Sequence, residues 1–387
     1  MPVDPGRFVP IGKGKDQFRG HRGPFISEDI GTWKPNVNRS GALFSNLFPK
    51  FNPMKSFKHT EVNWGVLGAG DVCEKKSAPA MQKIKGSRLV AVMRRNGEKA
   101  ADYARRHGVS KWYDDADDLI NDPEVNAIYI ATPPHAHMEL TIKAATAGKP
   151  VYVEKPMARN FEECKQMIAA CEQASLPLYV AYYRRSLPNF LKVKSLLDEG
   201  AIGKPRYVTI MMNQPRHPDV KASLKENWRI DPEKAGGGYF YDLGSHQLDL
   251  LDFLLGPIAD VCGVASNQAG EYPAEDIVLG NFSFSSGVLG AGNWCFTTGE
   301  PSRKDEIKII GAEGEISFPC FWGTDVTLRK NGKGEQVFAF EMPENIQFFL
   351  IKSIVDELLG KEAICPSTGE SAARTNRVME EMIGKYK

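Results

Sequence analysis

The stretch Trp64-Gly65-Val66-Leu67-Gly68-Ala69-Gly70-Asp71-Val72-Cys73 decides the fold of this chain. Its first four residues predict a short buried strand, and a helical segment follows the glycines and extends to about Lys85. A second strand is predicted from Arg88 to Met93. A strand, a glycine turn, a helix and another strand within about 30 residues are typical of a βαβ unit.

The glycines of this unit indicate a dinucleotide site. Gly68 suits the tight turn, and Gly70 allows the backbone to approach a pyrophosphate at the start of the helix. Cys73 stands where a third glycine is usual, which weakens the motif, although a small side chain still fits that packing position. We therefore expect five residues of the turn to bind the cofactor: Gly68, Ala69, Gly70, Asp71 and Val72.

The end of the second strand bears on the choice of cofactor. An NAD site expects an acidic residue about 20 positions after the glycines. Here Arg94 and Arg95 follow the strand, and the first carboxylate is Glu98. Guanidinium groups bind a 2′-phosphate, so the sequence favours NADP(H), with NAD(H) possible.

The following segments alternate between strands and helices. Strands are predicted at 125–131, 151–153 and 178–182, and helices at 138–147 and 161–174. This alternation predicts a doubly wound parallel sheet, whose ligands lie at the carboxyl ends of its strands. Residues just past those ends should line one crevice: Thr132, Lys155, Tyr183 and Arg184.

The chain changes character after Arg185. A helix is predicted at 188–200, and strands at 206–213, 260–266, 276–285, 288–296, 306–310, 315–318, 326–329 and 336–340. Short turns join most of these strands, so we expect a mostly antiparallel sheet. Helices at 344–359 and 369–383 close the chain.

A second glycine run, Gly236 to Gly238, leads into a helical segment with Asp242 and His246. If the helix begins near Asp242, these two residues stand at i and i+4 and face each other. A carboxylate that orients an imidazole is a common acid–base device. We expect the glycines to let the backbone pass close to cofactor or substrate.

Composition restricts the number of domains, the partners and the cellular location to be expected. The 387 residues are 42% hydrophobic and 25% charged, which suits two globular domains, and the net charge of +1 gives no reason to expect nucleic acid or a membrane as a partner. Seven scattered cysteines predict reduced thiols in the cytoplasm and no metal site. No apolar stretch resembles a secretory signal.

We predict three regions: an N-terminal extension at 1–60, a dinucleotide-binding domain at 61–182 and a substrate and oligomerisation domain at 183–387. The extension is rich in Gly, Pro and Phe. It is interpreted as an arm that packs on its own domain or a neighbouring subunit. The alternatives are an upstream extension with little function and a partner-binding tail.

Taken together, residues 61–387 resemble the glucose–fructose oxidoreductase / inositol dehydrogenase / MocA (Gfo/Idh/MocA) family. The resemblance rests on motifs in a fixed order: Gly65 to Gly70, Ala131 to Pro134 with His137, Glu154-Lys155-Pro156, Arg185 with Pro188, and Gly236 to Gly238 with Asp242, His246 and Asp249. It implies a Rossmann domain followed by an α/β domain whose open sheet commonly forms the subunit interface. It also implies a homodimer or homotetramer.

The resemblance assigns roles by position. Lys155, Asp242 and His246 are the implied catalytic residues, and either Lys155 or His246 is the formal base. Further cofactor contacts are implied at Thr132, Pro133, His137, Glu154 and Lys155. Candidates for the substrate pocket, besides Asp242 and His246, are Tyr182, Tyr183, Arg184, Trp228 and Tyr239, because aromatic and polar side chains suit a polyol. Asp249 either contacts a sugar hydroxyl or caps a surface.

The predicted function is an NADP(H)-preferring oxidoreductase acting on a hydroxyl or keto carbon of a sugar, sugar derivative or cyclitol. One alternative keeps the fold but recycles a tightly bound cofactor, as a sugar epimerase, a sugar–sugar oxidoreductase or an oxidative glycosidase would. Another is a non-catalytic dinucleotide-sensing regulator. Relatives of that kind tend to lose the lysine and the Asp/His pair, which this chain retains.

Overall fold

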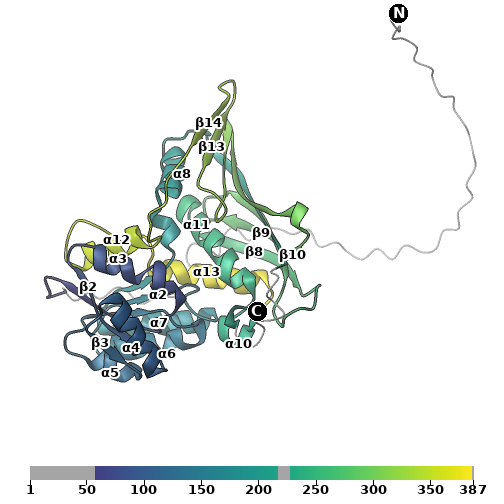
Figure 1. The fold of residues 1–387 in the computed structure, drawn as a ribbon. Coiled ribbons are helices and arrows are strands. Elements are labelled where there is room, and N and C mark those ends of the chain that lie inside the picture. Colours follow the sequence, from purple (N-terminus) through teal and green to yellow (C-terminus); the bar gives the residue numbers. More distant parts are fainter. Residues whose placement is uncertain (1–56, 217–226, 386–387) are drawn as a thin grey trace, which may run out of the picture. The chain divides into compact units, whose positions relative to one another are not determined.

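The computed structural model describes residues 57–216 and 227–385 of the chain (Figure 1). Residues 1–56, which hold nearly all of the predicted N-terminal arm, lie outside the described residues. That interpretation therefore stays a prediction. In the part that is described, no helix is both long enough and apolar enough to cross a membrane.

The first sheet has six parallel strands in the order β3-β2-β1-β4-β5-β6. Its strands are β1 (Val62–Leu67), β2 (Ser87–Met93), β3 (Lys111–Tyr113), β4 (Ala127–Ile130), β5 (Val151–Val153) and β6 (Leu178–Val180). This order is that of the dinucleotide-binding fold, and it confirms the predicted doubly wound parallel sheet. Strands β4, β5 and β6 are buried along their whole length, which explains their continuous apolar sequences.

Helices connect the strands of this sheet. They are α2 (Asp71–Lys75), α3 (Ala78–Lys83), α4 (Gly97–His107), α5 (Ala116–Asn121), η1 (Pro134–Ala136), α6 (His137–Thr146) and α7 (Phe161–Ala174). Local capping fixes several of these ends. The side chain of Asn160, for example, accepts a hydrogen bond from the N–H of Glu163 at the start of α7.

The second sheet has eight strands in the order β14-β13-β12-β11-β7-β10-β9-β8. They are β7 (Pro205–Pro215), β8 (Ile258–Ser266), β9 (Ile277–Phe284), β10 (Leu289–Thr298), β11 (Lys304–Gly311), β12 (Gly314–Phe318), β13 (Val326–Lys330) and β14 (Glu335–Phe338). Every neighbouring pair is antiparallel except β7 and β10. The predicted mostly antiparallel sheet is confirmed.

The remaining elements link the two sheets. They are η2 (Tyr183–Ser186), α8 (Pro188–Asp198), η3 (Trp228–Ile230), α10 (Pro232–Ala235), the π-helical turn η4 (Phe240–Gly244), α11 (Ser245–Leu255), η5 (Glu300–Ser302), α12 (Phe348–Leu358) and α13 (Gly369–Met382). Helix α13 packs on α7 and β6 on one side and on β8, β9 and α11 on the other. Helix α12 packs on α3 and η2. Lys155, which follows β5, bonds to Asp242 of η4, and Tyr182, which follows β6, contacts His246 of α11, so the carboxyl ends of these two strands lie next to η4 and α11.

Candidate functional site

The glycine turn after β1 bends tightly at Gly68 and leaves its backbone open at Gly70. Gly68 has φ +85°, and a Cβ atom there would lie 2.8 Å from the Cγ2 atom of Thr132. Gly70 begins α2 without a side-chain cap, and a Cβ atom there would meet nothing closer than a carbonyl oxygen at 3.8 Å. The Oγ1 atom of Thr132 is buried with no hydrogen-bond partner among the described residues. Free backbone space and an unsatisfied hydroxyl fit a dinucleotide.

Other residues of the turn divide between exposed and buried positions. Asp71 is exposed and Val72 half-buried, so both are accessible at the start of α2. Cys73 is fully buried, and its carbonyl accepts a hydrogen bond from the hydroxyl of Tyr103 at 2.8 Å. Cys73 thus takes the packing position that a third glycine usually holds. Burial raises the pKa of its thiol to about 12, so this cysteine is not a nucleophile.

The two arginines after β2 are available to a ligand. Arg94 is half-buried and Arg95 is exposed. The N–H of Arg94 donates to the carbonyl of Tyr113 at 3.2 Å, which fixes the backbone beside β3. Neither guanidinium forms an ion pair with another described residue.

Two of the residues implied as cofactor contacts instead hold loops in place. His137 is fully buried, with Nδ1 3.0 Å from the carbonyl of Met157 and Nε2 2.7 Å from the carbonyl of Thr132. Glu154 is also buried, and its Oε1 accepts hydrogen bonds from Tyr129 and Gln347, each at 2.6 Å. Pro133, half-buried, lies in the loop that His137 anchors.

Lys155 and Asp242 form the centre of the site. Lys155 follows β5, and its Nζ donates to Oδ1 of Asp242 at 2.5 Å and to the Asp242 carbonyl at 3.0 Å. The other carboxylate oxygen lies 3.4 Å from Nε of Arg229. Burial alone would raise the pKa of Asp242, but Lys155 and Arg229 outweigh it and hold the pKa below its usual value. Asp242 is therefore a carboxylate at neutral pH.

The expected contact between Asp242 and His246 is wrong. Asp242 lies in the π-helical turn η4, and its carboxylate is drawn to the ammonium of Lys155 rather than to the imidazole. Nδ1 of His246 is buried and has no hydrogen-bond partner among the described residues. A carboxylate is attracted more strongly to an ammonium group than to a neutral ring, so Asp242 pairs with Lys155 rather than with His246. The i and i+4 spacing carries no information about Lys155, which is distant in the sequence.

His246 instead lies among aromatic rings. It is only 3% exposed, and its ring centroid is 5.8 Å from that of Tyr182, 5.3 Å from that of Tyr183 and 5.9 Å from that of Phe321. Burial lowers the pKa of His246 well below 6.5, and the positive charges of Arg184 and Lys155 lower it further. The imidazole of His246 is therefore neutral at pH 7.

The glycine run before η4 serves the protein's own packing. Gly236 has φ +90°, and a Cβ atom there would lie 2.3 Å from the carbonyl oxygen of Arg159. A Cβ atom at Gly237 would lie 2.3 Å from the ring of Tyr241. Whether the backbone of these glycines also approaches a ligand stays a prediction. The glycines let this turn pack against the loop after β5, against Tyr241 and against Ala274.

The predicted pocket residues fall into two groups. Tyr183 and Arg184 lie in η2 beside His246, as predicted, whereas Tyr239 packs against Tyr272 and accepts a hydrogen bond from Asn227 at 3.1 Å. Trp228 is half-buried and stacks with Arg229 at 4.6 Å, which connects it to Asp242 through that arginine. Sequence reasoning missed Arg229 and Phe321, since neither belongs to a recognisable motif.

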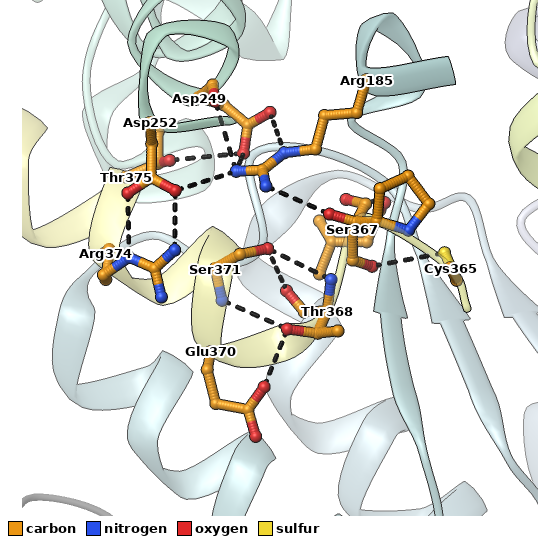
Figure 2. A network of polar contacts seen from close by, with 12 residues as sticks. Arg185, Asp249, Asp252, Cys365, Ser367, Thr368, Glu370, Ser371, Arg374 and Thr375 are labelled. Carbon is orange, nitrogen blue, oxygen red and sulfur yellow. Dashed lines mark hydrogen bonds and ion pairs between the residues drawn. The ribbon is translucent and has the colours of Figure 1, made fainter. Parts of the chain in front are cut away.

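Asp249 neither faces a substrate nor caps a surface. It is fully buried, and its two carboxylate oxygens accept hydrogen bonds from Arg185 at 2.8 and 2.7 Å (Figure 2). Asp252 makes a similar two-oxygen contact with Arg374, at 2.8 and 2.6 Å, and also lies 3.3 Å from Arg185 (Figure 2). This cluster, which we call the arginine clamp (Arg185, Asp249, Asp252 and Arg374), joins η2, α11 and α13.

Comparison with known proteins agrees with this architecture. Residues 62–182 match the family described as "Oxidoreductase family, NAD-binding Rossmann fold", and residues 190–317 match the "GFO/IDH/MocA C-terminal domain". Oxidoreductase P35 of Formosa agariphila is 39% identical over 325 residues, which cover 84% of this chain and 99% of that protein. The chain belongs to the Gfo/Idh/MocA family. It is therefore an oxidoreductase with an NAD-binding Rossmann fold.

Two further proteins are similar at lower identity. The 1,5-anhydro-D-fructose reductase of Ensifer adhaerens is 30% identical over 290 residues, covering 73% of this chain and 84% of that enzyme. Among solved structures, a levoglucosan dehydrogenase in complex with NADH and levoglucosan has a TM-score of 0.76 at 23% identity. That likeness covers 84% of this chain and 97% of the other, and it shows a common fold.

Proposed function

We propose that this Gfo/Idh/MocA protein transfers a hydride between a nicotinamide dinucleotide and a CH–OH carbon of a sugar, a sugar derivative or a cyclitol. The observation that carries the proposal is the Lys155–Asp242 pair beside the neutral His246, at the carboxyl end of the sheet that bears the glycine turn. A relative 30% identical to this chain is a 1,5-anhydro-D-fructose reductase, which supports a sugar-like substrate.

The residues divide the work of alcohol oxidation between them. The nicotinamide ring, when bound, accepts the hydride from the carbinol carbon. Lys155, held in position by its ion pair with Asp242, places its ammonium group where the substrate oxygen becomes negative. His246 is neutral and has an unpartnered ring nitrogen, so it takes the hydroxyl proton and returns it in the reverse direction.

Substitution of Lys155 tests this assignment. We expect Lys155→Met and His246→Gln each to lower kcat by about 100- to 10,000-fold, the range for loss of a group that acts on the reacting atoms. The control is Lys143→Gln, on the outer face of α6, which should match the wild type. The measurement is absorbance at 340 nm with a panel of sugars and cyclitols.

The same panel separates the proposal from its alternatives. Wild-type rates in both active-site variants would overturn the catalytic assignment. Turnover without a net change at 340 nm, with cofactor retained through purification, would favour an enzyme that recycles its cofactor. Dinucleotide binding without turnover of any substrate would favour a sensing regulator.

We further propose a preference for NADP(H) over NAD(H). Arg94 and Arg95 end β2 with no ion-pair partner in the described part of the chain, and a 2′-phosphate would supply the missing negative charge. In Arg94→Ala/Arg95→Ala, we expect the ratio of kcat/KM for NADP to that for NAD to fall by about 10- to 100-fold. Arg105→Ala, an exposed arginine of α4, is the control. An unchanged ratio would contradict the proposal.

We infer a homodimer or homotetramer in the cytoplasm. The support for assembly is a row of exposed apolar side chains on the outer face of the second sheet: Tyr207, Met211, Val264, Leu279 and Leu289. The support for the location is that all seven cysteines are free thiols. The domain boundaries at residues 60 and 182 remain a prediction.

A further inference from the structure

The side chain of Arg184 is a buried cation with no anionic partner. It is 6% exposed, and its guanidinium lies over the rings of Tyr183 at 5.0 Å and Phe321 at 4.3 Å. Its Nε donates to the carbonyl of Cys320 at 3.0 Å, and its Nη1 is buried without a hydrogen-bond partner. Arg184 forms no ion pair with any residue of 57–216 or 227–385. Burial of a guanidinium without an anionic partner costs free energy, which a ligand carrying a negative charge would offset.

The nearby carboxylate of Asp305 does not pair with the Arg184 guanidinium. Asp305 lies at the start of β11, and its carboxylate accepts hydrogen bonds from the backbone N–H groups of Cys320 at 3.1 Å, Phe321 at 2.5 Å and Trp322 at 2.8 Å. These bonds fix the loop that carries Phe321 and the carbonyl bonded to Arg184. Asp305 is therefore engaged with this loop and forms no ion pair with Arg184, so the Nη1 edge of the guanidinium has no partner among the described residues.

This free edge lies beside the reacting groups. His246 packs against the same two rings as Arg184, Tyr183 at 5.3 Å and Phe321 at 5.9 Å. Among the charged groups that lower the pKa of His246, Arg184 is the strongest and Lys155 the next. Among the described residues, Lys155 and Arg229 both pair with one carboxylate, that of Asp242, which forms no ion pair with Arg184. The site thus carries an excess of positive charge.

We propose that Arg184 binds a carboxylate group of the substrate, so that the substrate is a sugar acid, an aldonate or a uronate, rather than a neutral sugar. The inference rests on the proposed function and names the substrate class of the same site. A planar guanidinium between two rings presents one edge, which matches the planar carboxylate.

The test compares acids with neutral analogues of similar size and stereochemistry. D-glucuronate and D-galacturonate are each paired with the methyl ester, and D-gluconate with D-glucitol. For the wild type we expect kcat/KM for the acid to exceed that for its neutral partner by about 10- to 100-fold, as for a hydrogen-bonded charge pair. Arg184→Met should remove the difference, and Arg184→Lys should keep part of it. Arg105→Gln, exposed on α4, should behave as the wild type.

The outcomes separate this inference from the proposed function. If neutral partners or sugar phosphates are preferred, or if Arg184→Met leaves the preference for the acid unchanged, the carboxylate site is wrong and the oxidoreductase assignment stands. If no compound is oxidised, calorimetry of D-glucuronate and its ester with the enzyme–NADP complex decides. Binding of the acid that Arg184→Met and Arg184→Lys both weaken would support the carboxylate site, and absence of binding would overturn it. Melting temperatures identify a variant that fails to fold, in which case the lysine variant alone is compared.

Discussion

Single residues in the site are tuned by their neighbours rather than by their sequence spacing. Asp242 stays ionised because Lys155 and Arg229 offset its burial, and His246 stays neutral because burial and nearby cations disfavour its charged form. The two groups are four positions apart, yet they take opposite ionisation states without bonding to each other. This separation gives the site a fixed ion pair and a free imidazole.

The neutral state of His246 predicts a pH dependence of stability. Its pKa in the folded protein lies well below 6.5, so below about pH 6.5 the unfolded chain binds a proton here that the native state does not. The free energy of unfolding should therefore fall as the pH drops. This group should contribute a loss of about 1.4 kcal/mol between pH ~8 and pH ~5.5.

Denaturant unfolding at both pH values measures this contribution. His246→Gln has no titrating ring at this position, so it should lose about 1.4 kcal/mol less than the wild type over the same interval. His59→Gln, exposed in the segment before β1, should keep the wild-type difference. Equal pH differences in His246→Gln and the wild type would show that His246 is not held neutral.

At the scale of elements, the local sequence predicted those helix and strand bounds that local interactions determine. Helix 161–174 and strand 151–153 were predicted with the bounds that the structure shows, since a capping Asn160 and a fully apolar strand mark them. Strand β3 and helix α5 were not predicted, because three half-exposed residues and six residues are too short to show periodicity.

The geometry of the site was less accessible to prediction than its elements. Helical spacing predicted a contact between Asp242 and His246, and only the family resemblance placed Lys155 in the same site. The ion pair between Lys155 and Asp242 spans 87 positions, and the bond between Arg184 and Cys320 spans 136. Which partner a carboxylate selects depends on how two sheets meet, and a local pattern carries no information about that.

The arginine clamp determines how α11, and with it His246, is held against η2. Arg185 contacts Asp249 on α11 through two hydrogen bonds and also donates to the carbonyl of Pro366 at 3.1 Å (Figure 2). Burial raises the pKa of Asp249 to about 6 even though Arg185 opposes the shift. The pair is therefore costly to break from one side, because the partner is left buried and charged.

We predict that Arg185→Met lowers the free energy of unfolding by about 3–5 kcal/mol, the usual cost of removing one partner of a buried pair. Arg185→Met/Asp249→Leu should recover much of this loss, since it removes both charges. Chemical denaturation of the two single variants and the double variant measures the coupling. A double variant as unstable as the sum of the single ones would show that the two residues do not act as a pair.

At the scale of the whole molecule, the second sheet has one face in the core and one face open to solvent. In β9 the residues alternate between buried and exposed, and α13 packs on the buried face of β8 and β9. On the open face, Tyr207 of β7 stands next to Leu289 of β10, and Val264 of β8 next to Leu279 of β9. Val264 is 71% exposed and Leu289 57%. Apolar side chains clustered in this way on several strands are typical of a subunit interface.

Charged substitutions on this open face test whether it forms a subunit interface. If it forms the interface between subunits, a charge placed on it would be buried without a partner, so Leu289→Asp and Tyr207→Asp should each convert the oligomer to a monomer. Light scattering after size-exclusion chromatography, at micromolar protein, measures the mass. Ile364→Asp, 86% exposed between α12 and α13 and outside the sheet, should keep the wild-type mass. A wild-type monomer would exclude an interface on this face. Sheet variants that retain the mass of a wild-type oligomer would place the interface elsewhere, because an unpaired carboxylate buried in an interface of ordinary size would destabilise the oligomer.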